Sequence, residues 1–181
     1  MSNLNRWLMI PALIMPAAVS APAFAVQYLS VEQAQKVLFP GADQFEVWPV
    51  TLSTAQSSAI EAASGVRVRK AEIKAWRANQ GGKAAGWFVL DEVYGKHEFF
   101  TYAVAIGLDG AMKGVEIMDY RETHGGEVQN PKWRAQFIGK KTGDALKLDD
   151  DIKNISGATL SCKHLTDGVK RLLATHQAAL K

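Results

Sequence analysis

A short segment near the C-terminus, Ser156–Thr159, places a hydroxyl side chain after two small residues and directly before a long helical pattern. Free backbone N–H groups and the helix dipole favour an anion at the N-terminus of a helix. A Thr hydroxyl there could bind a phosphate group or carry it as an ester. Ser and Thr are also the commonest helix N-caps. On spacing alone, the simpler interpretation is that Ser156 caps the helix and Thr159 is an exposed first-turn residue.

The surrounding elements predict an α+β domain, in which helices flank a twisted antiparallel sheet and a long helix ends the chain. A capping box at Ser30 and Gln33 and a terminal Gly65 delimit two N-terminal helices. Asp109-Gly110 is typical of a hairpin turn. We expect helices at residues 30–38, 53–63, 130–137 and 160–180, and strands at residues 72–77, 87–90, 99–106 and 114–118.

The N-terminal residues have the pattern of a secretory signal peptide. Arg6 precedes an uncharged apolar run, and Ala23-Phe24-Ala25 supplies the small residues that a signal peptidase reads. Residues 1–25 are therefore predicted to be a cleavable signal peptide, which implies a periplasmic protein. An uncleaved membrane anchor is the alternative, because residues 7–26 carry no charge. Prolines within the run favour cleavage.

Composition narrows the function classes. The formal net charge is +3 with both signs interspersed, so no nucleic-acid partner is predicted. The single Cys162 excludes an internal disulfide and Cys-rich metal sites, and we interpret it as a small buried residue. The four His residues have no acidic partners at short spacing, so we predict no metal site. Trp133 and Phe137 are spaced as core residues.

Three landmarks in the C-terminal half carry a family resemblance. They are the Asp109-Gly110 hairpin, the segment Tyr120-Arg121-Glu122-Thr123-His124-Gly125-Gly126 with Trp133 and residues 137–140 behind it, and the Ser-Gly-Ala-Thr segment with its helix. In this order they resemble the FMN-binding domain of the periplasmic subunits of sodium-translocating NADH:quinone reductases and Rnf complexes. On this resemblance, residues 84–181 form the FMN-binding domain. Residues 26–83 supply an N-terminal helical segment and a first strand packed on the same domain.

The resemblance also implies a cofactor site. A flavin transferase would join FMN through its phosphate to the hydroxyl of Thr159, with Lys163 as a possible counter-charge and His124 as the best-placed His for a proton role. The residues implied to surround FMN are Ser156, Gly157, Ala158, Thr159, Ser161, Glu122, Thr123, His124 and Gly125.

Two positions depart from the family pattern. Lys153 stands where family members usually have Asp, although residues 149–151 are acidic. In the upstream loop, His124 replaces a Pro, and Gly126-Glu127 replaces Leu-Gly. These differences bear on recognition by the transferase and on the contacts with the flavin.

The resulting hypothesis is a periplasmic electron-transfer flavoprotein with membrane-associated or periplasmic redox partners. We assign no catalytic residue, because no acid–base or nucleophile–base pair is evident. An electron carrier is therefore favoured over a self-contained enzyme. The alternatives are a non-redox binding module on the same fold and a flavin-dependent reductase of a small acceptor in which His124 donates a proton.

Overall fold

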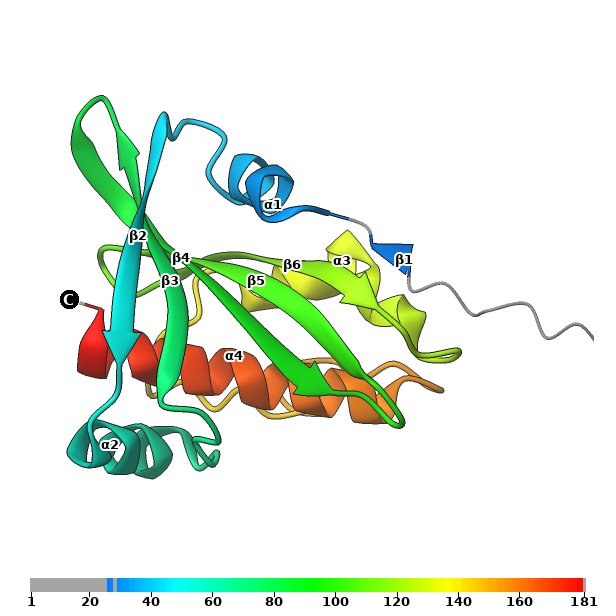
Figure 1. Ribbon diagram of the computed structural model, residues 1–181. Coiled ribbons are helices and arrows are strands. Elements are labelled where there is room, and N and C mark those ends of the chain that lie inside the picture. Colours follow the sequence, from blue (N-terminus) through cyan, green and yellow to red (C-terminus); the bar gives the residue numbers. More distant parts are fainter. Residues whose placement is uncertain (1–25, 28, 181) are drawn as a thin grey trace, which may run out of the picture.

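The computed structural model describes residues 26–27 and 29–180, so the predicted signal peptide at residues 1–25 lies outside the described part of the chain. Within it, six strands form one antiparallel sheet in the order β1-β6-β5-β4-β3-β2 (Figure 1). The strands are β1 (Val26–Gln27), β2 (Gln44–Thr51), β3 (Glu72–Gln80), β4 (Lys83–Tyr94), β5 (Phe99–Gly107) and β6 (Met112–Tyr120). The predicted α+β class is confirmed.

The helices begin and end at the signals found in the sequence. Ser30 and Gln33 form the expected capping box, and Gly65 ends the second helix in the left-handed conformation with φ 67°. Asn130 accepts a hydrogen bond from the Lys132 N–H at the start of a short helix. The elements are α1 (Val31–Leu38), α2 (Thr54–Ser64), α3 (Pro131–Arg134), α4 (Thr159–Ala179) and the 3₁₀ turns η1 (Gly126–Gln129) and η2 (Ala135–Phe137).

The sheet extends further towards the N-terminus than the sequence analysis predicted. The strands β1 and β2 were not expected, and they form the two edges of the sheet. Pro49 lies within β2 and weakens its strand signal, but an edge strand tolerates Pro because one side of its backbone is unpaired. Since β3 pairs with β4, one sheet runs across the predicted boundary at residue 84.

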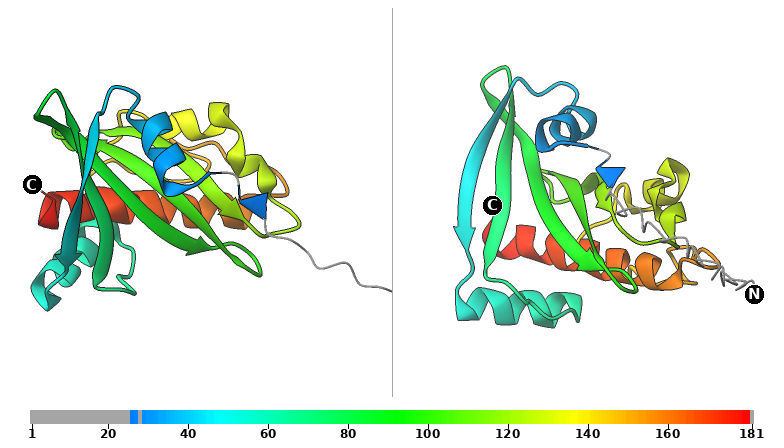
Figure 2. Two further views of the ribbon diagram at one scale, coloured as in Figure 1. Left: turned by 45° about the horizontal axis from the view of Figure 1, so that its top comes forward. Right: turned by 45° about the vertical axis from the view of Figure 1, so that its right-hand side comes forward.

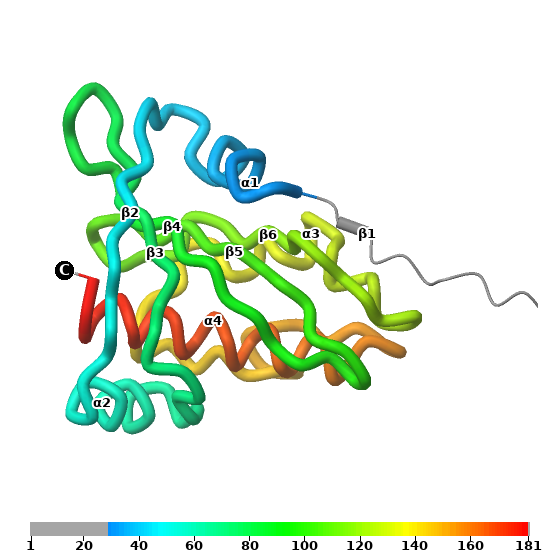
Figure 3. Tube along the Cα trace, in the orientation of Figure 1, coloured from blue at the N-terminus to red at the C-terminus, as the bar shows by residue number. Residues whose placement is uncertain are grey.

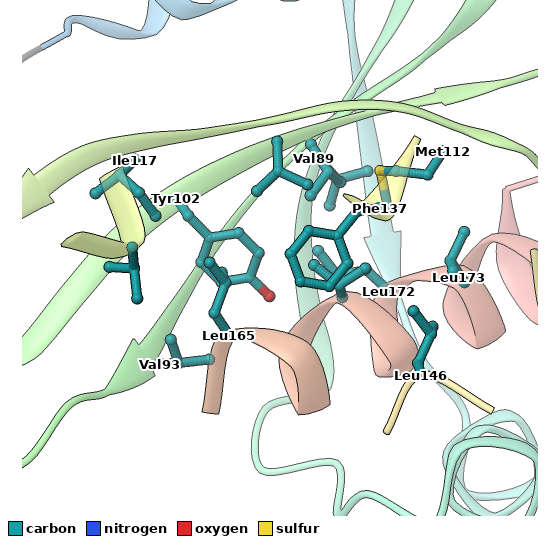
Figure 4. Close-up of a cluster of buried hydrophobic side chains, with 14 of the residues drawn as sticks. Val89, Val93, Tyr102, Met112, Ile117, Phe137, Leu146, Leu165, Leu172 and Leu173 are labelled. Carbon is teal, nitrogen blue, oxygen red and sulfur yellow. The ribbon is translucent and has the colours of Figure 1, made fainter. Parts of the chain in front are cut away.

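Alternate side chains of the central strands serve two apolar layers, as the two-residue period of a strand requires. On β5, Tyr102 and Val104 belong to the main core beneath α4, whereas Ala103 and Ala105 belong to the layer beneath α1. Figure 4 shows Tyr102, Val89 and Ile117 of the sheet facing Leu165 and Leu172 of α4.

The helices are distributed over both faces of the sheet. In Figure 2, α4 crosses one face and α1 covers the other, while α2 lies beside α4. Ile60 of α2 and Ala174 of α4 share a third apolar cluster. The predicted apolar stripe of α4 is buried at Leu165, Val169, Leu172, Leu173 and His176. Across the described residues, no helix has the length and apolar character needed to span a bilayer.

Candidate functional site

Three segments that are distant in sequence meet at the N-terminal end of α4. They are the turn between β4 and β5, the loop after β6, and the Ser-Gly-Ala-Thr segment, all at one end of the molecule (Figure 3). Together they enclose an open pocket of about 240 Å³. Its lining residues are Lys96, His97, Glu122, His124, Gly125, Gly157, Ala158, Thr159, Leu160 and Ser161.

Thr159 is the first residue of α4 and its side chain is exposed. The N-cap is Ala158, which makes no side-chain capping hydrogen bond, so the interpretation of Ser156 as the cap is wrong. Gly157 explains the difference, because its left-handed φ of 86° places Ser156 in the turn before the helix. The first backbone N–H groups of a helix have no intrahelical acceptor. This helix end therefore presents unpaired donors and a reactive hydroxyl together.

A hydroxyl chain joins the loop after β6 to α4. The Tyr120 hydroxyl donates to the His124 carbonyl oxygen at 2.7 Å and lies 3.0 Å from Ser161 Oγ. Because Tyr120 has one hydroxyl proton, the Ser161 hydroxyl donates to the Tyr120 oxygen. Burial raises the pKa of Tyr120 above its usual value, which keeps this donor protonated. Ser161 thus lies in the pocket wall as a loop-fixing group.

Glu122 is bound to the turn between β4 and β5. Its Oε1 atom accepts the backbone N–H groups of Lys96, His97 and Glu98, the last at 3.0 Å. Burial by itself raises the pKa of Glu122, but the three N–H groups outweigh it and hold the pKa below its ordinary value. The resemblance implied that Glu122 surrounds the cofactor, and it does line the pocket, with one oxygen already committed to the turn.

The structure brings seven of the nine predicted site residues to this pocket and leaves two outside its lining, Ser156 and Thr123. Thr123 Oγ1 lies 2.9 Å from Nδ1 of His124, which is exposed. The pocket also contains Lys96, His97 and Leu160, which the sequence analysis did not include. The signal that could have suggested Lys96 and His97 is their position in a hairpin turn, but only strand pairing places that turn beside Thr159.

Several other predicted roles are changed or supported by the packing. Lys163 forms an ion pair with Asp167 along the helix at 2.8 Å and does not line the pocket. Lys153 is exposed, and its carbonyl accepts the indole N–H of Trp133 at 2.6 Å. Trp133, Phe137 and Cys162 are buried core residues, as predicted. Burial raises the pKa of the Cys162 thiol, which disfavours a nucleophilic thiolate.

These residues fit the phosphate end of FMN. The uncapped start of α4, the exposed Thr159 hydroxyl and the basic Lys96 side chain share one pocket, a combination that suits a phosphate dianion. Leu160 is 44% exposed beside Thr159 and offers an apolar surface at the rim. Within the described residues, no group of three His, Cys, Asp or Glu side chains could hold a metal ion.

Comparison with known proteins identifies the same part of the chain. Residues 95–174 match the family model of the FMN-binding domain, which begins in the turn between β4 and β5 and ends within α4. The NqrC component of the Na(+)-translocating NADH-quinone reductase of Vibrio anguillarum is 39% identical over 75 residues, covering 32% of this chain and 29% of that protein. The corresponding Pasteurella multocida protein is 28% identical over 152 residues, covering 72% of this chain and 58% of its own length.

Solved structures share the fold. The crystal structure of Shewanella oneidensis NqrC superposes with a TM-score of 0.53 at 16% identity, covering 79% of this chain and 84% of that one. The first relatives are matched over less than a third of their own length, at 29% and 27%. The pocket and its hydroxyl segment lie within the matched family region. The chain therefore carries an FMN-binding domain similar to that of the NqrC components of Na(+)-translocating NADH-quinone reductases, and FMN is the cofactor of this domain.

Proposed function

We propose that this chain is a periplasmic electron-transfer protein whose FMN is attached through its phosphate to Oγ1 of Thr159. One observation carries the proposal: Thr159 is an exposed hydroxyl residue at an uncapped helix N-terminus inside the pocket of an FMN-binding domain. In the ester, the new Oγ1–P bond replaces the hydroxyl hydrogen. The chain then gains the mass of FMN less one water.

The residues of this chain would bind and orient the cofactor. The N–H groups of the first turn of α4 and the Lys96 ammonium would neutralise the phosphate charge. Asn154 donates to Thr159 Oγ1 at 3.3 Å and would hold this oxygen in place. The loop at Gly125, tied to α4 through Tyr120 and Ser161, would limit access of water from one side. The flavin, when bound, supplies one- or two-electron transfer.

The electron-transfer role is supported by the kind of protein that the chain resembles. Its relatives are components of NADH-quinone reductases, so we infer that it exchanges electrons with membrane-associated or periplasmic redox proteins. Attachment by a flavin transferase agrees with export through the predicted signal peptide, because a covalent bond retains the cofactor outside the cytoplasm.

The attachment is tested by co-expressing the full chain with a flavin transferase and measuring the intact mass of the product. We expect removal of residues 1–25, a gain of FMN less one water, and yellow colour that stays with the acid-denatured chain. Thr159→Ala abolishes the gain, since no other residue replaces the exposed hydroxyl at the start of α4. The matched controls Ser156→Ala and Thr123→Ala remove exposed hydroxyls near the pocket and retain the flavin.

Two results would contradict the proposal. Covalent flavin in Thr159→Ala would assign the ester to another hydroxyl. A colourless wild-type chain would favour the reversible binding module. In that case, a gain of covalent flavin in Lys153→Asp would trace the failure to transferase recognition at Lys153.

A further inference from the structure

The turn between β4 and β5 is held from two sides. Glu122 accepts three consecutive backbone N–H groups, those of Lys96, His97 and Glu98, on one carboxylate oxygen. On the other side, Nδ1 of His164 on α4 lies 3.2 Å from the Gly95 carbonyl oxygen. A bond from the Gly95 N–H to the Glu98 carbonyl closes the turn at 2.7 Å. The conformation of this exposed turn is therefore set by specific polar contacts.

The fit between Glu122 and the turn depends on Gly95. A Cβ atom at Gly95 would lie 2.5 Å from Glu122 Oε1 and 2.9 Å from its Cγ. The carboxylate therefore occupies the space that a side chain at residue 95 would take. Hydrogen bonds to an ionised acceptor are about twice as strong as neutral ones, so this contact dominates the conformation of the turn.

The same turn supplies two pocket residues. Lys96 and His97 donate their backbone N–H groups to Glu122, and both also line the pocket at Thr159. Both are exposed, so neither is held in place by burial. Their backbone position is set by the carboxylate that binds them.

We propose that Glu122 is a positioning residue, which holds the β4–β5 turn so that Lys96 and His97 face the phosphate of FMN at Thr159. Lys96 and His97 are then the cofactor-contacting residues, and Glu122 acts through them. This inference rests on the proposed attachment of FMN at Thr159. It differs from the role implied by the family resemblance, in which Glu122 itself surrounds the cofactor.

The contact is tested first on the full mature chain produced without a flavin transferase, by following backbone amide NMR shifts with pH. In the wild type we expect the amides of Lys96, His97 and Glu98 to titrate together, because one carboxylate binds all three. Their common pKa lies below the ordinary Glu range, and the contact is lost as the pH falls through it. The charged or ionisable neighbours of this carboxylate are His97, Lys96 and Tyr120.

Variants separate Glu122 from other acids. Glu122→Gln removes the common titration, and Glu122→Ala raises hydrogen exchange at the three amides by about tenfold or more, as expected for the loss of charge-assisted bonds. The matched control Glu127→Ala removes an exposed carboxylate of the same loop and leaves both readouts unchanged. Independent titration of the three amides in the wild type would overturn the proposal.

The link to the cofactor is tested on the flavinylated protein by the ³¹P NMR shift of the attached phosphate. We expect Glu122→Ala to shift this resonance as the double variant Lys96→Ala/His97→Ala does. Combining all three changes adds no further shift, since Glu122 acts only through the turn. Additive shifts would assign Glu122 a direct contact with the cofactor and overturn the positioning role. If the wild type carries no flavin, the proposed attachment fails, while the amide titration still reports on the turn.

Discussion

At the scale of single residues, the site depends on a close approach at Gly125. Gly125 has φ 84°, a conformation that L side chains rarely adopt. A Cβ atom there would lie 2.7 Å from the Tyr120 hydroxyl and 3.0 Å from Ser161 Oγ. The hydroxyl chain from the loop to α4 therefore passes through the space that any larger residue would occupy. Glycine at this position lets the loop lie against the helix that carries Thr159.

Gly125→Ala should lower the free energy of unfolding by about 1–3 kcal/mol, through the strained φ and the displaced hydroxyls. Urea denaturation of the flavin-free chain measures the change. The neighbouring Gly126→Ala is the control, because its nearest atom is the flexible Gln129 amide at 3.3 Å and its φ is not positive. Equal losses in both variants would show that the close approach at Gly125 carries no special cost.

At the scale of elements, the distance between α4 and the sheet is set by Gly168. A Cβ at this position would lie 2.4 Å from the Tyr102 hydroxyl and 2.9 Å from Val93 Cγ1. Tyr102 is fully buried and donates to Asp91 at 2.6 Å, and Asp91 also pairs with Arg171 of α4. Burial raises the pKa of Tyr102 well above its usual value, so it stays a donor. The helix thus packs over this polar group only because one residue lacks a side chain.

Gly168→Ala should destabilise the protein by about 1–3 kcal/mol, because overpacking exceeds the gain of about 1 kcal/mol in helix propensity. Thermal unfolding monitored by circular dichroism gives the change. In a Tyr102→Phe background the same substitution should cost less, since the closest atom has been removed. A stabilised Gly168→Ala protein would mean that propensity decides at this position.

At the scale of the whole molecule, the FMN-binding domain is completed by residues that precede the matched family region. β3 pairs with β4 from Lys74 to Gln80, and Ala75 belongs to the main core. Trp48 of β2 packs edge-on against Trp87 at 5.3 Å between ring centroids. Without these strands, β4 would expose an unpaired edge and part of its apolar face.

A chain limited to residues 84–181 should therefore lack a cooperative unfolding transition, whereas residues 26–181 should unfold in one step. The physical reason is that the sheet and its core are shared across residue 84. Thermal circular dichroism, together with the dispersion of amide NMR shifts, distinguishes the two. A cooperative transition in the shorter chain at the same temperature would show that β2 and β3 are an independent addition.

Features that depend on near neighbours could be predicted from the amino-acid sequence. Helix ends at Ser30, Ser53 and Gly65, the hairpin at Asp109-Gly110 and the small-residue turn before Thr159 arise from backbone preferences and local hydrogen bonds. Such signals are complete within a few residues. They also include the hydroxyl segment that indicated a phosphate site, since a helix N-terminus is a local structure.

Which distant segments share the pocket was settled by tertiary packing. Lys96 and His97 reach Thr159 because β4 and β5 pair and α4 crosses their end, and Glu122 is turned towards backbone N–H groups that no spacing rule locates. The unexpected edge strand β2 likewise depends on its pairing with β3, since its own pattern includes Pro49. Contacts between remote residues follow from the packing of the whole sheet and helix, so local preferences could predict the acceptor hydroxyl but not the charges around it.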